Sequence, residues 1–353
     1  MARGVGFGPT TNRLTVDGST TELPPNIYLK NYLDIISNLT KLVNLGNNTL
    51  MILEEIGELP GYELLDSGDG FKLERFGDFV LARPDPAILW HRALSESDWG
   101  KADALYIKSG DPEKAEKGAW QKNTAVPEKW LMAYGSGASA ISFYAKLTAF
   151  KHTGVFPEQA ANWKFIKEKL GSHDAGGVAK GTKVLNLFGY TGIASVLCAK
   201  LGAAVTHVDA SKPSITWAKE NMLASDLLET AIRWILEDAL KFVKREVRRG
   251  SKYDAIILDP PAFGRGDKGE VWKFNENLPE LLAEITKLID PANFKFLIIN
   301  AYAVSVSSLL LKNLLTDMAG ELGLKNPKID YGELVLKEKT GRELSTGIFA
   351  RLY

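Results

Sequence analysis

The residues best placed to do chemistry stand where apolar segments end in the second half of the chain. Residues 186–192 (NLFGYTG) close one such segment and Asp209 ends the next, while Asp238 and residues 259–263 (DPPAF) follow two others. Ligands of open parallel sheets bind beyond the carboxyl ends of the strands. We therefore expect these polar strand ends to share one ligand site.

The turn after the first of these segments has features of a nucleoside site. Gly189 and Gly192 allow a tight turn and a close approach of a ligand to the backbone, just before a helix N-terminus. Asp209 lies 17 residues beyond Gly192, where a carboxylate can accept hydrogen bonds from both hydroxyls of a ribose. Each feature also has a structural interpretation. Such a turn is an ordinary connection, and Asp209 can cap the helix that begins near Ser211.

Asp238 is open to the same two interpretations. It can accept a hydrogen bond from an adenine amino group, and it can cap the helix that follows it. The two roles are compatible.

The most specific motif is the Asp-Pro-Pro-Ala-Phe sequence after the apolar segment 255–258. Two consecutive prolines cannot continue a central strand and fix the backbone, so the Asp259 carboxylate and the neighbouring carbonyls are expected to project into the cleft. Phe263 can stack on a planar substrate. An aspartate-initiated turn explains the prolines but not their coincidence with the other polar strand ends.

The segments around these residues alternate between strands and helices. Near-continuous apolar runs at 184–188, 204–208, 231–235, 255–259 and 294–300 are typical of parallel strands that are covered on both faces. Residues 333–337 and 346–352 lack an intervening helix and suit a closing antiparallel hairpin. The expected fold class is α/β, with a Rossmann-like seven-stranded sheet that is mostly parallel.

The first part of the chain has a different texture. We expect residues 1–58 to form an N-terminal extension that is partly helical over 27–58. Turn residues at 67–70 and 77–78 separate short apolar runs, which predicts a small β-rich domain over 59–150 on the substrate side. Residues 151–353 form the third predicted domain.

Composition limits the classes of function. Across 353 residues, 43 basic side chains balance 43 acidic ones, so a polyanion must meet a local patch. Six basic residues within 241–252 either contact phosphate or form ion pairs on a solvated helix face. The single cysteine, Cys198, excludes disulfide scaffolds, and no metal site is expected. With no signal sequence and no apolar run of about 18 residues, we expect a cytoplasmic protein without a membrane partner.

Four strings together carry a family resemblance: FKHTGVFPEQAANW, VLNLFGYTGIASVLCAKLGAAVTHVDAS, DALKF and LDPPAFGRG. They resemble the class I S-adenosylmethionine-dependent methyltransferases. More narrowly, the chain resembles the 23S ribosomal RNA base methyltransferases that act at cytosine C5 or guanine N7, in a branch without a PUA domain. The resemblance covers residues of about 60–353 and is strongest over 150–275.

The resemblance implies a methyltransferase sheet with S-adenosylmethionine as cofactor. Residues implied around its methionine part are Asn186, Phe188, Tyr190, Thr191 and Gly192. Those implied around its ribose and adenine are Asp209, Ala210, Ser211, Asp238 and Ala239. The upstream segment is implied to close the cofactor site through His152, Thr153, Gly154, Phe156, Gln159 and Asn162. The implied catalytic residues, which position the methyl acceptor, are Asp259, Pro260, Pro261 and Phe263.

The chain departs from these relatives at two places. Relatives that make 5-methylcytosine need a thiolate nucleophile, commonly after the fifth strand, where this chain has residues 300–303 (NAYA). Cys198 lies inside a predicted helix and is expected to be a buried apolar side chain. Relatives also often have arginines after an Asp-Gln pair, where this chain has residues 158–163 (EQAANW). The first departure favours transfer to nitrogen over a cysteine-dependent C5 route.

The expected function is methylation of a base in structured RNA, with ribosomal RNA as the expected partner. One alternative is a methyltransferase for a small molecule or a protein amide, and another is a noncatalytic RNA-binding factor. A nicotinamide-dependent dehydrogenase is disfavoured, because the three-glycine fingerprint is incomplete and the Asp-Pro-Pro motif has no role in it. The sequence makes no prediction of the oligomeric state.

Overall fold

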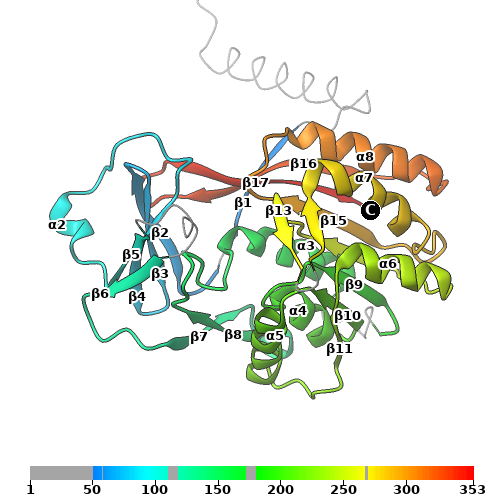
Figure 1. The fold of residues 1–353 in the computed structure, drawn as a ribbon, viewed down its shortest axis with the longest axis horizontal. Helices are drawn as coiled ribbons and strands as arrows, with labels where there is room; N and C mark the ends of the chain where they lie inside the picture. The colour runs from blue at the N-terminus through cyan, green and yellow to red at the C-terminus, as the bar shows by residue number, and fades with distance from the viewer. Residues whose placement is uncertain (1–50, 58, 110–117, 172–179, 267–268) are drawn as a thin grey trace, which may run out of the picture. The chain divides into compact units, whose positions relative to one another are not determined.

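An eight-stranded sheet lies at the centre of the computed structural model, which describes residues 51–57, 59–109, 118–171, 180–266 and 269–353 (Figure 1). In sheet order its strands are β1 (Ile52–Glu55), β16 (Ile329–Lys337), β17 (Glu343–Leu352), β15 (Phe296–Ala301), β12 (Ala255–Leu258), β9 (Lys183–Leu187), β10 (Ala204–Asp209) and β11 (Ile232–Leu236). Neighbours from β15 to β11 are parallel, and β17 runs antiparallel to both β15 and β16. The mostly parallel sheet and its C-terminal antiparallel hairpin are confirmed.

The sheet has one strand more than the seven expected. Residues 52–55 belong to the segment predicted to be helical, most of which lies outside the described residues, yet they form β1 in parallel pairing with β16. Ile52 lies opposite Gly332, where any Cβ atom would collide with the Ile52 backbone. Glycine at position 332 therefore permits this pairing. Hydrogen bonds to the edge of β16 make residues 52–55 a strand, although the spacing of apolar residues there predicts a helix.

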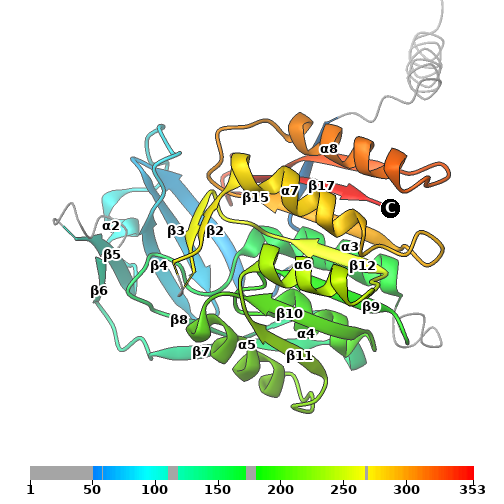
Figure 2. The same cartoon turned by 45° about the vertical axis from the view of Figure 1, so that its right-hand side comes forward.

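Helices cover both faces of this sheet, as Figure 2 shows for α6, α7 and α8 on one side. That side carries α6 (Ala239–Arg248), α7 (Phe274–Thr286) and α8 (Ser308–Glu321), and the other carries α3 (Ala160–Leu170), α4 (Ile193–Lys200) and α5 (Lys212–Ala224). Alternate strand residues divide between the two cores: Ile257 packs with α3 and α4, whereas Ile256 packs with α6 and α7. None of the described helices is long and apolar enough to span a membrane.

The β-rich region has its own sheet, in which β2 (Tyr62–Gly68), β3 (Phe71–Phe76), β4 (Phe79–Pro84), β5 (Ala104–Lys108) and β6 (Gly118–Lys122) follow in chain order. A short helix α2 (Glu96–Trp99) precedes β5, and β7 (Lys129–Tyr134) pairs with β8 (Ile141–Lys146) across the 3-10 turn η2 (Gly137–Ser139). The β2–β3 turn uses Asp69 and Gly70, with φ of 51° and 78°, as a tight hairpin requires. That residues 59–150 are an independent domain stays a prediction.

The β-rich region is joined to the C-terminal hairpin. The Ser67 hydroxyl donates to the Glu338 carboxylate, and Arg342 Nη1 donates to the Ser67 carbonyl at 2.9 Å. Around these polar contacts, Leu64 of β2 packs with Leu336 of β16 in a small apolar cluster. These contacts hold the β-rich region next to the β16–β17 hairpin of the large sheet.

Replacing Gly332 with alanine is expected to lower the free energy of unfolding by about 1–3 kcal/mol, because the new methyl group overpacks the β1–β16 pairing. Gly320→Ala in α8 is the matched control, since nothing lies within 4 Å of its Cβ position. The control is expected to gain about 0.5–1 kcal/mol of helix propensity. Urea unfolding followed by circular dichroism measures both changes. Equal stability of Gly332→Ala and the unaltered protein would show that β1 does not rest on β16.

Candidate functional site

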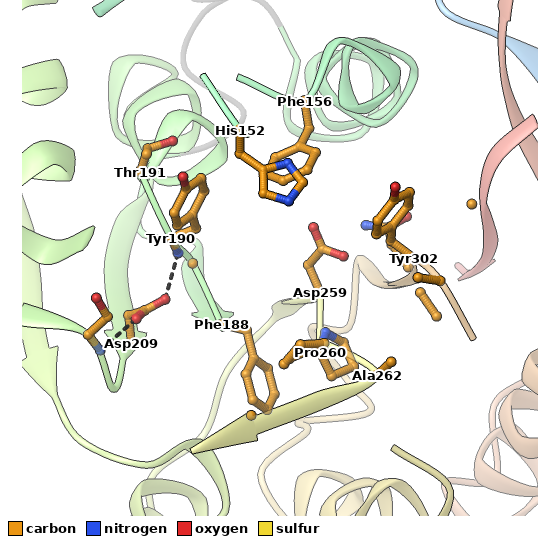
Figure 3. Close-up of a pocket in the computed structure, with 18 of the residues that line it drawn as sticks. His152, Phe156, Phe188, Tyr190, Thr191, Asp209, Asp259, Pro260, Ala262 and Tyr302 are labelled. Carbon is orange, nitrogen blue, oxygen red and sulfur yellow. Dashed lines mark hydrogen bonds between the residues drawn. The ribbon is translucent and has the colours of Figure 1, made fainter. Parts of the chain in front are cut away.

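A cavity of about 980 Å³ opens at the carboxyl ends of β9, β10, β12 and β15 (Figure 3). Its walls include the turns after these strands, the start of α6, and the segment between β8 and α3, with further residues from β5, β16 and β17. The predicted residues that line it are His152, Gly154, Phe156, Gln159, Asn186, Phe188, Tyr190, Thr191, Asp209, Ala210, Ser211, Asp238, Ala239, Asp259, Pro260, Pro261 and Phe263. The strand ends identified in the sequence therefore meet at one site.

Thr153, Asn162 and Gly192 are not among the lining residues. Thr153 is fully buried behind the cavity wall, and Asn162 is turned toward Arg351 of β17, whose Nε donates to Asn162 Oδ1 at 2.8 Å. Gly192 has φ of 74° and starts α4 against Ala218. These three positions shape the residues around the cavity and lie behind its surface.

The turn after β9 has an uncommon backbone. Phe188 and Tyr190 have φ of 56° and 48°, a region that costs non-glycine residues about 1–3 kcal/mol each. A Cβ atom on Gly189 would collide with the His207 ring, so the turn lies directly on β10. Asn221 Nδ2 holds the turn from α5 by donating to the Thr191 carbonyl at 2.8 Å.

Asp209 joins this turn to the end of β10. One carboxylate oxygen accepts from Tyr190 N and the other from Ser211 N, both at 2.8 Å (Figure 3). Burial raises the pKa of Asp209, although the two backbone N–H groups oppose that shift. Each oxygen of a carboxylate has two lone pairs, so Asp209 can still accept hydrogen bonds from ligand hydroxyls in the cavity.

Asp238 fulfils its structural role and still faces the cavity. Its Oδ1 accepts from Lys241 N at 2.9 Å, which caps α6, while the residue also contributes to the cavity wall. Asn186 is largely committed to the protein, since its Nδ2 donates to Ser195 Oγ at 2.8 Å.

Asp259 lies near the middle of the cavity, between Tyr190 and Tyr302, with its carboxyl group directed toward His152 (Figure 3). Burial, and then the charge of Glu158, raise its pKa to about 7. The side-chain amide of Gln159 donates to Oδ2 of Asp259 at 3.3 Å. A carboxyl group with a pKa near neutrality can exchange a proton with a bound ligand.

Trp272 holds the residues after Asp259 in place. Its indole Nε1 donates to the Pro261 carbonyl at 2.7 Å, and its ring centroid lies 4.9 Å from that of Phe188. Trp272 is buried, so it supports the motif and does not itself offer an open stacking surface. Phe263, in the hairpin of β13 (Phe263–Arg265) and β14 (Val271–Lys273), is 53% exposed.

The cavity wall also contains polar residues that were not assigned to the site from the sequence, among them Lys151, Glu158, Asn300 and Tyr302. Asn300 lies at the carboxyl end of β15 and Tyr302 follows it, so the rule that identified the other strand ends could have found them. Glu158 lies in the 3-10 turn η3 (Pro157–Gln159) and is buried, which raises its pKa. Nothing in the sequence indicated which side of that turn faces the cavity.

The ionisable rings around Asp259 are those of His152, Tyr190 and Tyr302, and they do not change charge near neutral pH. Burial, aided by the charge of Arg83, lowers the pKa of His152 to about 3, so this imidazole is neutral. Burial raises the pKa of Tyr190 and of Tyr302 to about 12. Among these rings and Asp259, Asp259 is thus the group that titrates near neutral pH.

Four of the six basic residues at 241–252 form ion pairs with acidic side chains. Lys244 pairs with Glu280, and Arg249 Nη1 lies 2.8 Å from Glu246 Oε1. Lys252 Nζ donates to the Lys287 carbonyl at 2.8 Å. These contacts favour the solvated helix face over the phosphate-binding interpretation.

No model of a known protein family matches the chain. Ribosomal RNA large subunit methyltransferase K/L from Shewanella frigidimarina is 36% identical over 191 residues, and that from Shewanella amazonensis is 35% identical over 237 residues. These matches cover 54% and 62% of this chain but 25% and 31% of the relatives, so the chain spans about a third or less of their length.

The likeness to one solved structure runs through most of both chains. The SAM-dependent methyltransferase from Agrobacterium tumefaciens aligns with a TM-score of 0.75 and 39% sequence identity, over 86% of this chain and 93% of that one. Identity at this level over nearly a whole relative reflects common descent as well as a common fold. The chain therefore belongs to the S-adenosylmethionine-dependent methyltransferases.

Proposed function

We propose that the protein transfers a methyl group from S-adenosylmethionine to a hydrogen-bearing nitrogen of a base in structured RNA, with ribosomal RNA as the substrate and the cytosol as its compartment. The observation that carries this proposal is the position of Asp259. Its carboxyl group lies in the same cavity as Asp209 and the β9 turn, and Phe263 stands exposed beside it.

The cavity fits the cofactor in size and chemistry. A volume of about 980 Å³ is at the upper end of small-molecule sites, so it can hold a nucleoside-sized ligand together with part of an acceptor. Asp209 would hold the ribose hydroxyls, and Asp238 with Ala239 would meet the adenine. The turn from Phe188 to Thr191 would surround the methionine part.

The chemistry assigned to Asp259 is proton acceptance. S-adenosylmethionine supplies a methyl group on a positively charged sulfur. The acceptor nitrogen uses its lone pair to form the new N–C bond while the S–C electron pair remains on sulfur, and the N–H proton passes to Asp259. A catalytic carboxylate whose pKa is near the working pH is largely ionised and is still basic enough to accept a proton.

Transfer to nitrogen agrees with the state of the single cysteine. Cys198 is fully buried in α4, and burial raises the pKa of its thiol to about 12. The cysteine-dependent C5 route needs a thiolate beside the base. The cavity wall at the end of β15 has Asn300 and Tyr302, and no cysteine lies among the described residues that line the cavity.

Aromatic and cationic side chains around the cavity support a nucleic-acid acceptor. Phe150 is 44% exposed and, like Phe263, lines the cavity. Exposed Lys108 and Arg265 lie in the same wall, and the Arg265 guanidinium is 5.7 Å from the Phe263 ring centroid. Rings that stack on bases beside cations that meet phosphates are the usual elements of single-strand recognition. The names of the Shewanella relatives support the choice of ribosomal RNA.

Asp209→Asn is expected to weaken binding of S-adenosylmethionine at least about tenfold, since hydrogen bonds to a charged group contribute about 1.5–3 kcal/mol. Isothermal titration calorimetry measures the dissociation constant. Asp226→Asn makes the same chemical change at an exposed turn with φ of 56°, where asparagine is well tolerated, and should leave binding unaltered. Equal affinities of the two variants would remove Asp209 from the cofactor site.

The kcat/KM of methyl transfer is expected to fall about tenfold per pH unit below the pKa of Asp259, which is about 7 in the ligand-free protein, and to level off above it. The sign follows because only the ionised carboxylate accepts the proton, and burial keeps Asp259 protonated on the acid side. A pH–rate profile measures this limb. A rate that is constant from about pH 5.5 to 8 would contradict proton acceptance by Asp259.

Tritiated methyl from labelled S-adenosylmethionine is expected to enter ribosomal RNA prepared from cells that lack this enzyme. The Asp259→Ala variant should transfer none, and nucleoside analysis of the labelled RNA should identify a methylated nitrogen. Label at cytosine C5 would refute the nitrogen route. Cofactor binding without any label in RNA would refute the substrate and favour a small-molecule or protein acceptor.

A further inference from the structure

Hydrogen bonds between side-chain amides connect Asp259 to Arg351. The arginine determines which group donates and which accepts at each step. Arg351 is 3% exposed on β17, and its Nε donates to Oδ1 of Asn162 at 2.8 Å. Its Nη1 lies 3.5 Å from Glu54 Oε1 on β1. A guanidinium group has donors only, so Asn162 must present its oxygen to Arg351 and its NH₂ group to the opposite side.

The second step fixes the orientation of Gln159. Asn162 Nδ2 donates to Oδ1 of Asn300 at 2.8 Å and to Oε1 of Gln159 at 3.0 Å. Asn300 Nδ2 donates to the same Gln159 oxygen at 3.2 Å. Because its oxygen receives two donors, Gln159 must turn its NH₂ group the other way. That group meets Oδ2 of Asp259.

We propose that Arg351 is a positioning residue which, through Asn162 and Gln159, presents a permanent hydrogen-bond donor to Asp259 and so keeps its carboxylate ionised and aligned as a proton acceptor. Asn162 and Arg351 lie behind the cavity, so this role is distinct from cofactor binding. The catalytic meaning of this arrangement rests on the proposed methyl transfer, whereas the effect on the carboxyl group itself does not.

The donor matters because other features of the site act in the opposite direction. Burial and the Glu158 carboxylate of η3 both disfavour the ionised form of Asp259. Other titratable side chains in the cavity wall include His152 and Lys151 before η3, Tyr190 after β9 and Tyr302 after β15. The imidazole and the two phenols are neutral near pH 7, so Lys151, whose pKa is lowered by burial, is the one cation among these four side chains.

If the polarity of the chain were reversed, Gln159 would present its oxygen to Asp259. An amide oxygen accepts a hydrogen bond only from the protonated carboxyl group, so reversal would favour the protonated form. Asn162→Asp has this effect with almost no change in shape. The new carboxylate still accepts from Arg351, but it has no donor for Gln159.

The test is a titration of the Asp259 carboxyl carbon by NMR, using the full chain labelled with ¹³C at aspartate carboxyl groups and no substrate. Asp259→Asn identifies the resonance by its loss. We expect Asn162→Asp and Gln159→Leu each to raise the apparent pKa of Asp259 by about one unit, because a donor to the charged form is lost. Arg351→Lys retains a donor and a positive charge, so it should retain the pKa of the unaltered protein.

Asn300→Asp is the matched control for added charge. It places a carboxylate at the same branch point, which still accepts from Asn162. The Gln159 oxygen loses its donor from Asn300 but keeps the donor from Asn162, which maintains its orientation. Its shift should be clearly smaller than that of Asn162→Asp. Equal shifts in these two variants, or an unchanged pKa in Gln159→Leu, would overturn the proposal.

Thermal unfolding identifies variants that have lost their structure, and Gln159→Leu provides an independent reading if Asn162→Asp does not fold. Failure of the proposed function is separable from failure of this inference. Absence of label in RNA with the expected NMR shifts would leave the donor chain in place. Labelled RNA with no difference between Asn162→Asp and Asn300→Asp would leave the methyltransferase in place and remove the role of Arg351.

Discussion

The site depends first on the carboxylate of Asp209, which accepts hydrogen bonds from the backbone N–H groups of Tyr190 and Ser211. These bonds hold together two turns that follow neighbouring strands, and one of those turns has two non-glycine residues at positive φ. Such a backbone persists only where its surroundings over-determine it. Here Asn221 holds the same turn from α5, and Thr191 Oγ1 donates to the Gly154 carbonyl at 2.7 Å, which brings the segment before α3 onto the turn.

Much of this arrangement was predictable, for an identifiable reason. Buried parallel strands are recorded in the sequence as apolar runs, and their carboxyl ends meet at one edge whatever the detailed packing, so Asp209 and Asp259 could be placed in one cavity. The turn glycines were equally readable. Gly189 has no room for a side chain beside His207, and Gly192 has φ of 74°, although its place behind the cavity depends on the packing of α4 against α5.

What the sequence did not indicate depends on contacts between distant segments. Asn162 lies in α3, and the spacing of apolar residues in that helix does not show which of its sides faces the cavity. Its partner Arg351 is 189 residues further along the chain. Residues 52–55 have too few positions to reveal a strand, and β1 forms because β16 offers a sheet edge with a glycine at the closest approach. The Glu158 carboxyl group next to Gln159 acquires its influence only when η3 folds over Asp259.

Asp259 thus stands between opposing contributions that come from separate parts of the chain. Desolvation and Glu158 favour its neutral form, while the Gln159 amide, held in direction by Asn162 and Arg351, favours the ionised form. A fully solvated carboxylate would be ionised but weakly basic, and an isolated buried one would stay protonated at neutral pH. Proton acceptance near pH 7 needs both contributions together. This requirement explains why a donor chain that begins on β17, inside the large sheet, can matter for a site at the strand ends.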